Sequence, residues 1–292
     1  ADLAEPIIPH GYAHCARAHM QVHGLTREQL AMVAVLMSAQ ASYHPFALQR
    51  TPYDLNDVLS APPVAPYTGL YECARKSDGA AALIVTSASF SFAPIQVLGG
   101  GEAAGPMGLA KKNSALLSSI SSAAAAFEIA YKDAGVSEQH IDYFGVYDCF
   151  PICFIRGLEA ARLAPVGGGG KWVEEKYNLW LKCKGDGKRM STAGFPVNTH
   201  GGLLGFGAPW EVPALFSLVE ACEQLSGSAN EGGRQVAGCK RAAVYGNGGI
   251  FNASAVVVLE ALEKTTTAQK APELSFMERL AQEKRIDTQT PL

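Results

Sequence analysis

Apolar and polar positions alternate with helical spacing at the start of the chain. Residues 12–23 carry apolar side chains with polar ones between them, and Gly24 ends the segment. Thr26 and Gln29 form a capping-box pair that predicts the start of a second helix. A connector rich in Pro, Asp and Asn then holds a short predicted helix at 55–59.

The rest of the chain alternates short apolar runs with longer amphipathic ones. Residues 80–86 form a continuous apolar run, which is typical of a strand buried on both faces. Further strands are predicted at 95–98, 141–147, 242–245 and 254–259, and helices at 116–134, 149–163 and 209–225. Glycine clusters at 99–101, 167–170 and 246–249 predict a strand end, a flexible loop and a turn. This alternation predicts an α/β protein, in which helices pack on a mostly buried mixed sheet.

The amino-acid composition limits the classes of partner that we expect. The 292 residues carry a formal charge of −3 with scattered Lys and Arg, so we expect no nucleic acid as a partner. No apolar run is long enough to span a bilayer, and we expect no membrane contact. Seven cysteines without a stapling pattern, and no opening signal peptide, favour a cytoplasmic location.

Metal binding is not expected. Cys149 and Cys153 are close in sequence but lack the second pair of a zinc site. Four histidines at positions 10, 14, 19 and 23 superficially resemble a ladder of metal ligands, yet no carboxylate and only the single cysteine Cys15 lie among them in sequence. We expect them to shape a surface.

Four short segments place polar residues and glycines where predicted strands end, which is where sites of α/β proteins usually form. Glycines there let backbone N–H groups approach a carbonyl oxygen closely. The segments are residues 147–150, 198–202, 207–209 and 245–249.

The order and spacing of these segments resemble the C-terminal half of thiolases of the sterol-carrier-protein-X type. Residues 12–87 resemble the loop domain of that family, including the matches at 28–31 and 77–81. The resemblance implies an α/β thiolase fold, with mixed five-stranded sheets in a layered α/β/α/β/α arrangement and an N-terminal part outside this chain. It also implies a loop-domain-like segment at 1–78, a remnant of the N-terminal half at 79–93, the C-terminal half at 94–262 and a polar tail at 263–292.

The departures from the family pattern bear on the reaction. No cysteine here has the sequence context of the family's nucleophile, and Ala208 stands where the family has the histidine of Gly-His-Pro. Tyr147 replaces the first residue of His-Asp-Cys-Phe, and Tyr245 replaces the cysteine of Cys-x-Gly-Gly-Gly. Two tyrosines therefore occupy positions at which thiolases place an oxyanion donor and an acid/base.

This set suits a retro-aldol cleavage, which needs a base on a β-hydroxyl group and a donor to a thioester enolate, but no covalent nucleophile. It resembles the thiolase-fold aldolases of bacterial steroid side-chain degradation, which release propionyl-CoA. The resemblance implies coenzyme A as part of the substrate, no covalently bound cofactor, a homodimer, and a companion protein with an OB-fold and often a zinc ribbon. Two alternatives stay open: a thiolase-type acyltransferase with Cys149 as acid/base, and an inert subunit of a complex.

The predicted site residues follow from these positions. Structural interpretations stand beside them: Tyr147 could be half-buried with its hydroxyl in solvent, Asp148 could cap the helix that follows, Cys149 could fill the core, and His200 could be structural. The predicted catalytic residues are Tyr147, Tyr245, Asp148, Cys149 and His200, and the predicted substrate-binding residues are Asn198, Gly201, Gly202, Asn247 and Gly248.

Overall fold

The computed structural model describes residues 7–87, 94–105, 122–190 and 193–262. Residues 262–292 form a unit separate from residues 1–261, and the predicted tail at 263–292 lies outside the described residues. Nowhere in the described part of the chain is a helix long and apolar enough to cross a membrane.

Residues 7–72 begin with two helices, as predicted, and continue with shorter elements. They contain α1 (Ile7–His23), α2 (Arg27–Ala41), α3 (Leu55–Ser60), a two-stranded ribbon of β1 (Pro63–Ala65) and β2 (Thr68–Gly69), and a 3₁₀ turn η1 (Leu70–Glu72). The capping box is confirmed, because the Gln29 N–H donates to Thr26 Oγ1 and the Thr26 N–H donates to Gln29 Oε1, both at 3.2 Å. Helix α2 is buried along nearly its whole length and packs against α7 (Gly169–Asp186) and α8 (Gly202–Phe206).

The second segment is a mixed sheet with the strand order β3-β6-β5-β4. Its strands are β3 (Ile95–Ala104), β4 (Tyr143–Val146), β5 (Arg241–Gly248) and β6 (Ala253–Ala261); β4 and β5 are parallel and the other neighbours antiparallel. Residues 196–198 run beside β4, where the Phe144 N–H donates to Pro196 O and the Asn198 N–H donates to Phe144 O, both at 3.0 Å. This single bridge extends the four described strands, where the resemblance implies sheets of five.

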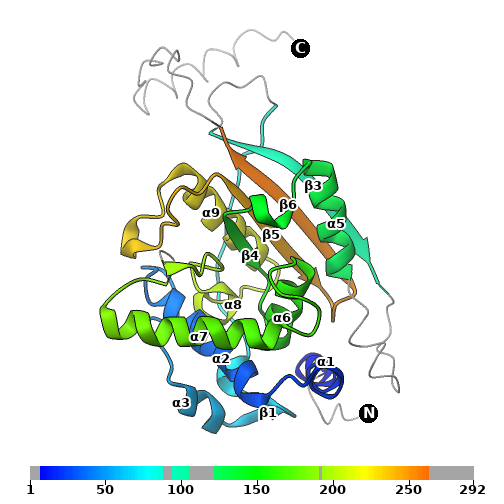
Figure 1. Ribbon diagram of the computed structural model, residues 1–292, viewed down its shortest axis with the longest axis vertical. Coiled ribbons are helices and arrows are strands. Elements are labelled where there is room, and N and C mark those ends of the chain that lie inside the picture. Colours follow the sequence, from blue (N-terminus) through cyan, green and yellow to red (C-terminus); the bar gives the residue numbers. More distant parts are fainter. Residues whose placement is uncertain (1–6, 88–93, 106–121, 191–192, 263–292) are drawn as a thin grey trace, which may run out of the picture. The chain divides into compact units, whose positions relative to one another are not determined.

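Helices cover both faces of this sheet (Figure 1). Helices α5 (Ser122–Ala134) and α6 (Pro151–Ala160) pack on one face and α9 (Pro213–Ser226) on the other, whereas α7 and α8 pack mainly against other helices. Side chains alternate along β5, so that Ala243 and Tyr245 join the core with α5 and α6, while Ala242 and Val244 join the core with α9. The alternation buries Tyr245 on the α6 side.

Two glycine clusters do not act as predicted. Strand β3 continues through residues 99–101. The glycines there allow α5 to pack closely on the strand, because a Cβ on Gly99 would lie 2.5 Å from Ala134 N and one on Gly101 would overlap the Ala126 carbonyl oxygen. Gly169 begins α7, a helix that was not predicted, and a Cβ on Gly170 would lie 2.6 Å from a Leu25 methyl carbon.

The predicted strand at 80–86 is wrong within the described structure. The segment has no regular structure, and Ile84 and Val85 are 94% and 84% exposed. No described strand pairs with it. An apolar run favours a strand only where neighbouring strands supply hydrogen bonds, and sequence alone does not reveal the neighbours.

Part of the predicted helix 116–134 lies outside the described residues, and strand β5 extends through the predicted turn as far as Gly248.

Candidate functional site

Tyr147 follows β4 and lines an open hollow of about 570 Å³. The floor of the hollow is made of small residues on β3, β5 and β6, since alanine or glycine occupies most of the positions that face it. Asn247 and Gly248 line it as well, while Trp210 and Glu211 form its rim at the start of α9. The structure therefore brings three of the predicted site residues, Tyr147, Asn247 and Gly248, to one surface.

The Tyr147 hydroxyl is held in its protonated form. Burial raises its pKa well above the ordinary value of 10, and the neighbouring Cys149, Cys153, Asp148 and Glu211 raise it further. A neutral phenol at this edge can donate a hydrogen bond into the hollow at neutral pH. Tyr147 is partly buried, which agrees with the structural interpretation as far as its ring is concerned.

Tyr245 does not line the hollow. Its side chain is 1% exposed beneath α6, and burial raises the pKa of its hydroxyl. That hydroxyl donates to Asn247 Oδ1 at 3.3 Å, and Asn247 Nδ2 donates to the Tyr12 hydroxyl at 3.1 Å. Tyr12 donates in turn to the Gly249 carbonyl at 2.6 Å. Asn247 therefore connects two buried tyrosines with the hollow.

Tyr12 was not identified from the sequence. It lies on α1, stacks on Phe150 with ring centroids 4.8 Å apart, and reaches Asn247 from 235 positions away in the chain. Nothing in its sequence neighbourhood marks it, because the signal is a long-range contact.

Cys149 lies near both predicted catalytic tyrosines, since its thiol raises the pKa of each. It is partly exposed, its Sγ lies 3.4 Å from Sγ of the buried Cys153, and both thiols influence the pKa of Tyr147 and of Tyr245. Cys149 does not line the hollow.

Asp148 serves as a cap, but of a different helix from the one predicted. Its Oδ1 accepts from the Leu203 N–H at 2.7 Å and its Oδ2 from the Leu204 N–H at 3.4 Å, at the start of α8 and not of α6. The side chain is completely buried, and burial raises its pKa to about 7. These contacts give Asp148 a structural role in joining β4 to α8.

Gly201 and Gly202 make this junction possible. Both have a positive φ, of 104° and 60°, and a Cβ on Gly202 would overlap the Asp148 carboxylate. A Cβ on Gly201 would collide with Ala41 of α2. Neither glycine lines the hollow, so the structure gives them a packing role where substrate binding was predicted.

Asn198 is also a structural residue. Its Oδ1 accepts from the Val146 N–H and its Nδ2 donates to the Val146 carbonyl, both at 2.7 Å. The side chain is completely buried and does not line the hollow, so its predicted substrate contact stays a prediction. Because Val146 precedes Tyr147, Asn198 fixes the end of β4 from which Tyr147 projects.

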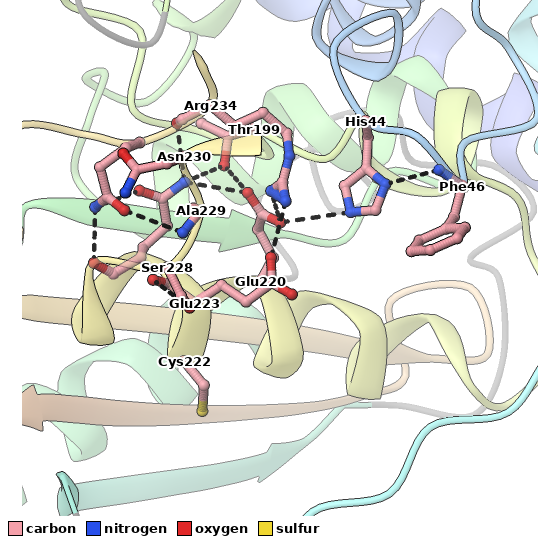
Figure 2. A network of polar contacts seen from close by, with 12 residues as sticks. His44, Phe46, Thr199, Glu220, Cys222, Glu223, Ser228, Ala229, Asn230 and Arg234 are labelled. Atoms are coloured by element: carbon pink, nitrogen blue, oxygen red, sulfur yellow. Dashed lines mark hydrogen bonds and ion pairs between the residues drawn. The ribbon is translucent and has the colours of Figure 1, made fainter. Parts of the chain in front are cut away.

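His200 is buried near Glu220, packs against Phe206 with ring centroids 5.5 Å apart, and does not line the hollow. It is 2% exposed, and burial lowers its pKa to about 4, with Glu220 acting against this shift and Arg234 in the same direction. Figure 2 shows the network around Glu220, which accepts from Thr199 Oγ1 and from Arg234 Nη1 at 2.5 Å. His200 does not line the hollow, so its predicted catalytic role stays a prediction.

His44, Glu220 and Glu223 could be mistaken for a metal centre. Their potential ligand atoms lie within 4.8 Å of one another. The Arg234 guanidinium, however, donates to Glu220 and, at 2.8 Å, to Glu223, so an arginine already supplies the positive charge (Figure 2). The early histidines form no such group in the described part of the chain; His19 Nε2 instead lies 3.1 Å from Glu159 Oε1.

Comparison with known proteins agrees with this architecture. Residues 101–261, more than half of the chain, match the family model described as thiolase C-terminal domain-like. An acetyl-CoA acetyltransferase of Methanothermobacter thermautotrophicus is 32% identical over 252 residues, which cover 85% of this chain and 62% of that protein. Sterol carrier protein 2 of Oryctolagus cuniculus is 27% identical, with 88% and 45% covered. The chain thus spans about half to three fifths of these relatives' length.

Two solved structures share the fold. The Ltp2-ChsH2(DUF35) aldolase superposes with a TM-score of 0.68 at 20% identity, over 86% of this chain and 63% of that chain. A monomeric SCP2-thiolase-like protein type 1 from Mycobacterium smegmatis gives a TM-score of 0.57 at 18% identity, over 88% and 52%. The mixed sheet, the helices on its two faces and the family match lead to one conclusion: this chain belongs to the thiolase C-terminal domain-like family.

Proposed function

We propose that the protein is a thiolase-fold aldolase that cleaves a β-hydroxyacyl-CoA by a retro-aldol reaction and releases propionyl-CoA. The observation that carries the proposal is Tyr147, a neutral phenol beside an open hollow, at a position where thiolases have histidine or asparagine. Ala208, which replaces the histidine of Gly-His-Pro, has no side-chain donor for acyl transfer. The fold similarity to an aldolase supports the same reaction class.

The hollow favours the acyl portion of such a substrate over the phosphates of coenzyme A. Its described lining contains two carboxylates, Glu102 and Glu211, and no lysine or arginine. Carboxylates repel phosphate, whereas the alanine and glycine floor accepts hydrocarbon. We therefore place the β-hydroxyl group and the acyl chain in the hollow.

In the proposed reaction a base removes the β-hydroxyl proton, and the Cα–Cβ bond breaks as the carbon–oxygen double bond of the ketone or aldehyde forms. The electron pair of the broken bond moves to the thioester and gives an enolate, which is then protonated to propionyl-CoA. Tyr147 lines the hollow and donates to the enolate oxygen, and the Tyr245 hydroxyl orients the side chain of Asn247, which lines the hollow as well. The phenol's raised pKa favours the donor role for Tyr147.

The experiment is cleavage of a 2-methyl-3-hydroxyacyl-CoA by the purified chain, with propionyl-CoA measured by mass spectrometry. Tyr147→Phe and Tyr245→Phe each remove a single hydroxyl group, and we expect at least about a 100-fold loss of turnover from Tyr147→Phe. Near-normal turnover in both variants, with measurable wild-type activity, would overturn the assignment.

A thiolase-type acyltransferase is the second candidate, favoured by the 32% identity to an acetyl-CoA acetyltransferase and by partly exposed Cys149. An acyl-cysteine trapped after incubation with acetyl-CoA would support it. An inert subunit is the third: such a chain would turn over no CoA thioester alone but would restore activity to a partner.

We also propose that the chain works with a companion protein. The name of the aldolase with a similar fold includes a DUF35 component, and a companion with an OB-fold and zinc ribbon is the corresponding proposal here. The homodimer stays a prediction, checked by light scattering on the chain alone and with a candidate companion.

A further inference from the structure

Two of the seven cysteines are in direct contact. Cys149 Sγ and Cys153 Sγ lie 3.4 Å apart, whereas a disulfide bond measures about 2.05 Å. Closing the bond therefore needs an approach of little more than an ångström. Both thiols are free in this structure.

The local backbone allows that approach. The Cys153 N–H donates to Phe150 O at 2.9 Å, which places Cys153 in the first turn of α6. Cys149 precedes the N-cap Phe150, so no helical hydrogen bond holds it, and its carbonyl accepts one hydrogen bond, from Ala74 N at 3.1 Å. The mobile member of the pair is thus Cys149.

The two thiols differ in access. Cys149 is partly exposed, whereas Cys153 is completely buried among α1 and α6 side chains, next to the Tyr12 hydroxyl. A small oxidant reaches the partly exposed Cys149 thiol first, and the buried Cys153 sulfur lies 3.4 Å from it. This arrangement is that of an attacked thiol and a resolving thiol.

We infer that Cys149 and Cys153 are a modification site, at which a hydroperoxide converts the pair to a reversible intramolecular disulfide. The Cys149 sulfur attacks the peroxide, becomes a sulfenic acid and releases water or an alcohol. The Cys153 sulfur then attacks the Cys149 sulfur, the sulfur–oxygen bond breaks, and a second water leaves with the Cys153 proton. Two thiols lose two electrons and the peroxide gains them.

The bridge has a consequence for the proposed reaction. Tyr147 lies two residues before Cys149, and Asp148 between them is fixed to α8. Drawing Cys149 toward α6 displaces this stretch and moves the Tyr147 hydroxyl relative to the hollow. This consequence rests on the proposed function, whereas the disulfide itself does not.

The test uses the full chain and hydrogen peroxide. After oxidation the free thiols are alkylated in denaturant, and trypsin releases residues 133–156, which contain both cysteines between Lys132 and Arg156. We expect this peptide to be lighter by two hydrogen atoms, to lack both alkyl groups, and to regain them after dithiothreitol. In Cys153→Ala we expect Cys149 to react with dimedone as a sulfenic acid, and Cys183→Ala should form the bridge as the wild type does.

Two results would overturn the inference: a fully alkylated 133–156 peptide at peroxide levels that oxidise other cysteines, or a link from Cys149 to residues 51–75, which carry Cys73. Turnover is measured in parallel on the same samples. A chain with no turnover in any state contradicts the proposed function and leaves the mass result standing.

Discussion

The hollow beside Tyr147 and the network around Glu220 use polar side chains in opposite ways. In the hollow, Tyr147 and Asn247 face open space among alanines and glycines. In the network, Thr199, Glu220 and Arg234 are no more than 3% exposed, and Arg234 donates to two carboxylates. The hollow leaves the Tyr147 hydroxyl available for a ligand, whereas the network uses its polar groups to join α9 to the segment before α8.

The comparison bears on one sequence motif, residues 198–202, whose composition indicates a site but whose contacts are structural. Residues 198–202 look like a site because they combine Asn, Thr, His and glycines. In the structure every one of them supports a neighbour: Asn198 holds β4, Gly202 admits Asp148, and His200 borders Glu220. The chemistry we propose therefore lies at Tyr147, which these residues position.

The largest effect is expected in the network. Arg234→Met leaves Glu220 buried without its cation and should cost about 3–5 kcal/mol of the free energy of unfolding. Urea unfolding at pH 7 measures this. The matched variant Arg241→Met breaks a more exposed pair with Glu260, and should cost about 1 kcal/mol or less. Equal costs would contradict the distinction between the buried and the exposed ion pair.

Acid should weaken the same region. The pKa of folded His200, about 4, is below its ordinary value of 6.5, so the unfolded chain binds a proton in this interval that the folded chain does not. The stability from neutral His200 is complete above pH 6.5 and lost as pH falls through 4, about 3 kcal/mol in total. His44, whose pKa is also lowered to about 4, acts in the same direction.

His200→Gln should therefore lose less stability than the wild type between pH 7 and pH 4, as measured by urea unfolding at each pH. Exposed His140→Gln serves as the control and should keep the wild-type dependence. An unchanged acid dependence in His200→Gln would show that the proton binds elsewhere.

The packed and open faces of β3 can be compared at adjacent residues. Gly101→Ala drives a methyl group into α5 and should cost about 1–3 kcal/mol. Gly100→Ala points to the exposed side, where the new Cβ lies 3.5 Å from Val256 O, and should change stability by less than about 0.5 kcal/mol. Thermal unfolding of the two variants measures these costs. A larger loss of stability in Gly100→Ala than in Gly101→Ala would mean that α5 does not pack as described.

The smallest effect on stability is expected at the rim of the hollow. Trp210 is 69% exposed and has φ of 49°, a strained conformation for a bulky residue. Trp210→Asn relieves this strain, so stability should be unchanged or higher by up to about 1 kcal/mol. Loss of the indole should raise KM for the acyl-CoA. A substantial loss of stability with unchanged KM would place Trp210 in the folding of the chain and not in substrate binding.

The sequence predicts what is local. The capping box of α2 depends on Thr26 and Gln29, three residues apart, and both hydrogen bonds form. The tyrosine at the end of β4 is likewise predicted, because a strand and the residue after it are continuous in the chain.

What the sequence does not predict depends on distant partners. Asp148 accepts a hydrogen bond from Leu203, 55 residues later in the chain, and Tyr12 accepts one from Asn247, 235 residues later. The apolar run at 80–86 has the composition of a buried strand and yet exposes Ile84. Composition sets a preference, whereas burial depends on which elements lie alongside.

The central claim is that the Tyr147 hydroxyl performs chemistry, and one comparison tests it most directly. Tyr147→Phe and Tyr143→Phe each remove one hydroxyl group from the same stretch of chain; Tyr143 lies in the α9-side core, away from the hollow. We predict that Tyr147→Phe lowers release of propionyl-CoA by at least about 100-fold while its unfolding free energy stays within about 1 kcal/mol of the wild type. Tyr143→Phe should retain turnover. Similar turnover in the two variants would contradict the account.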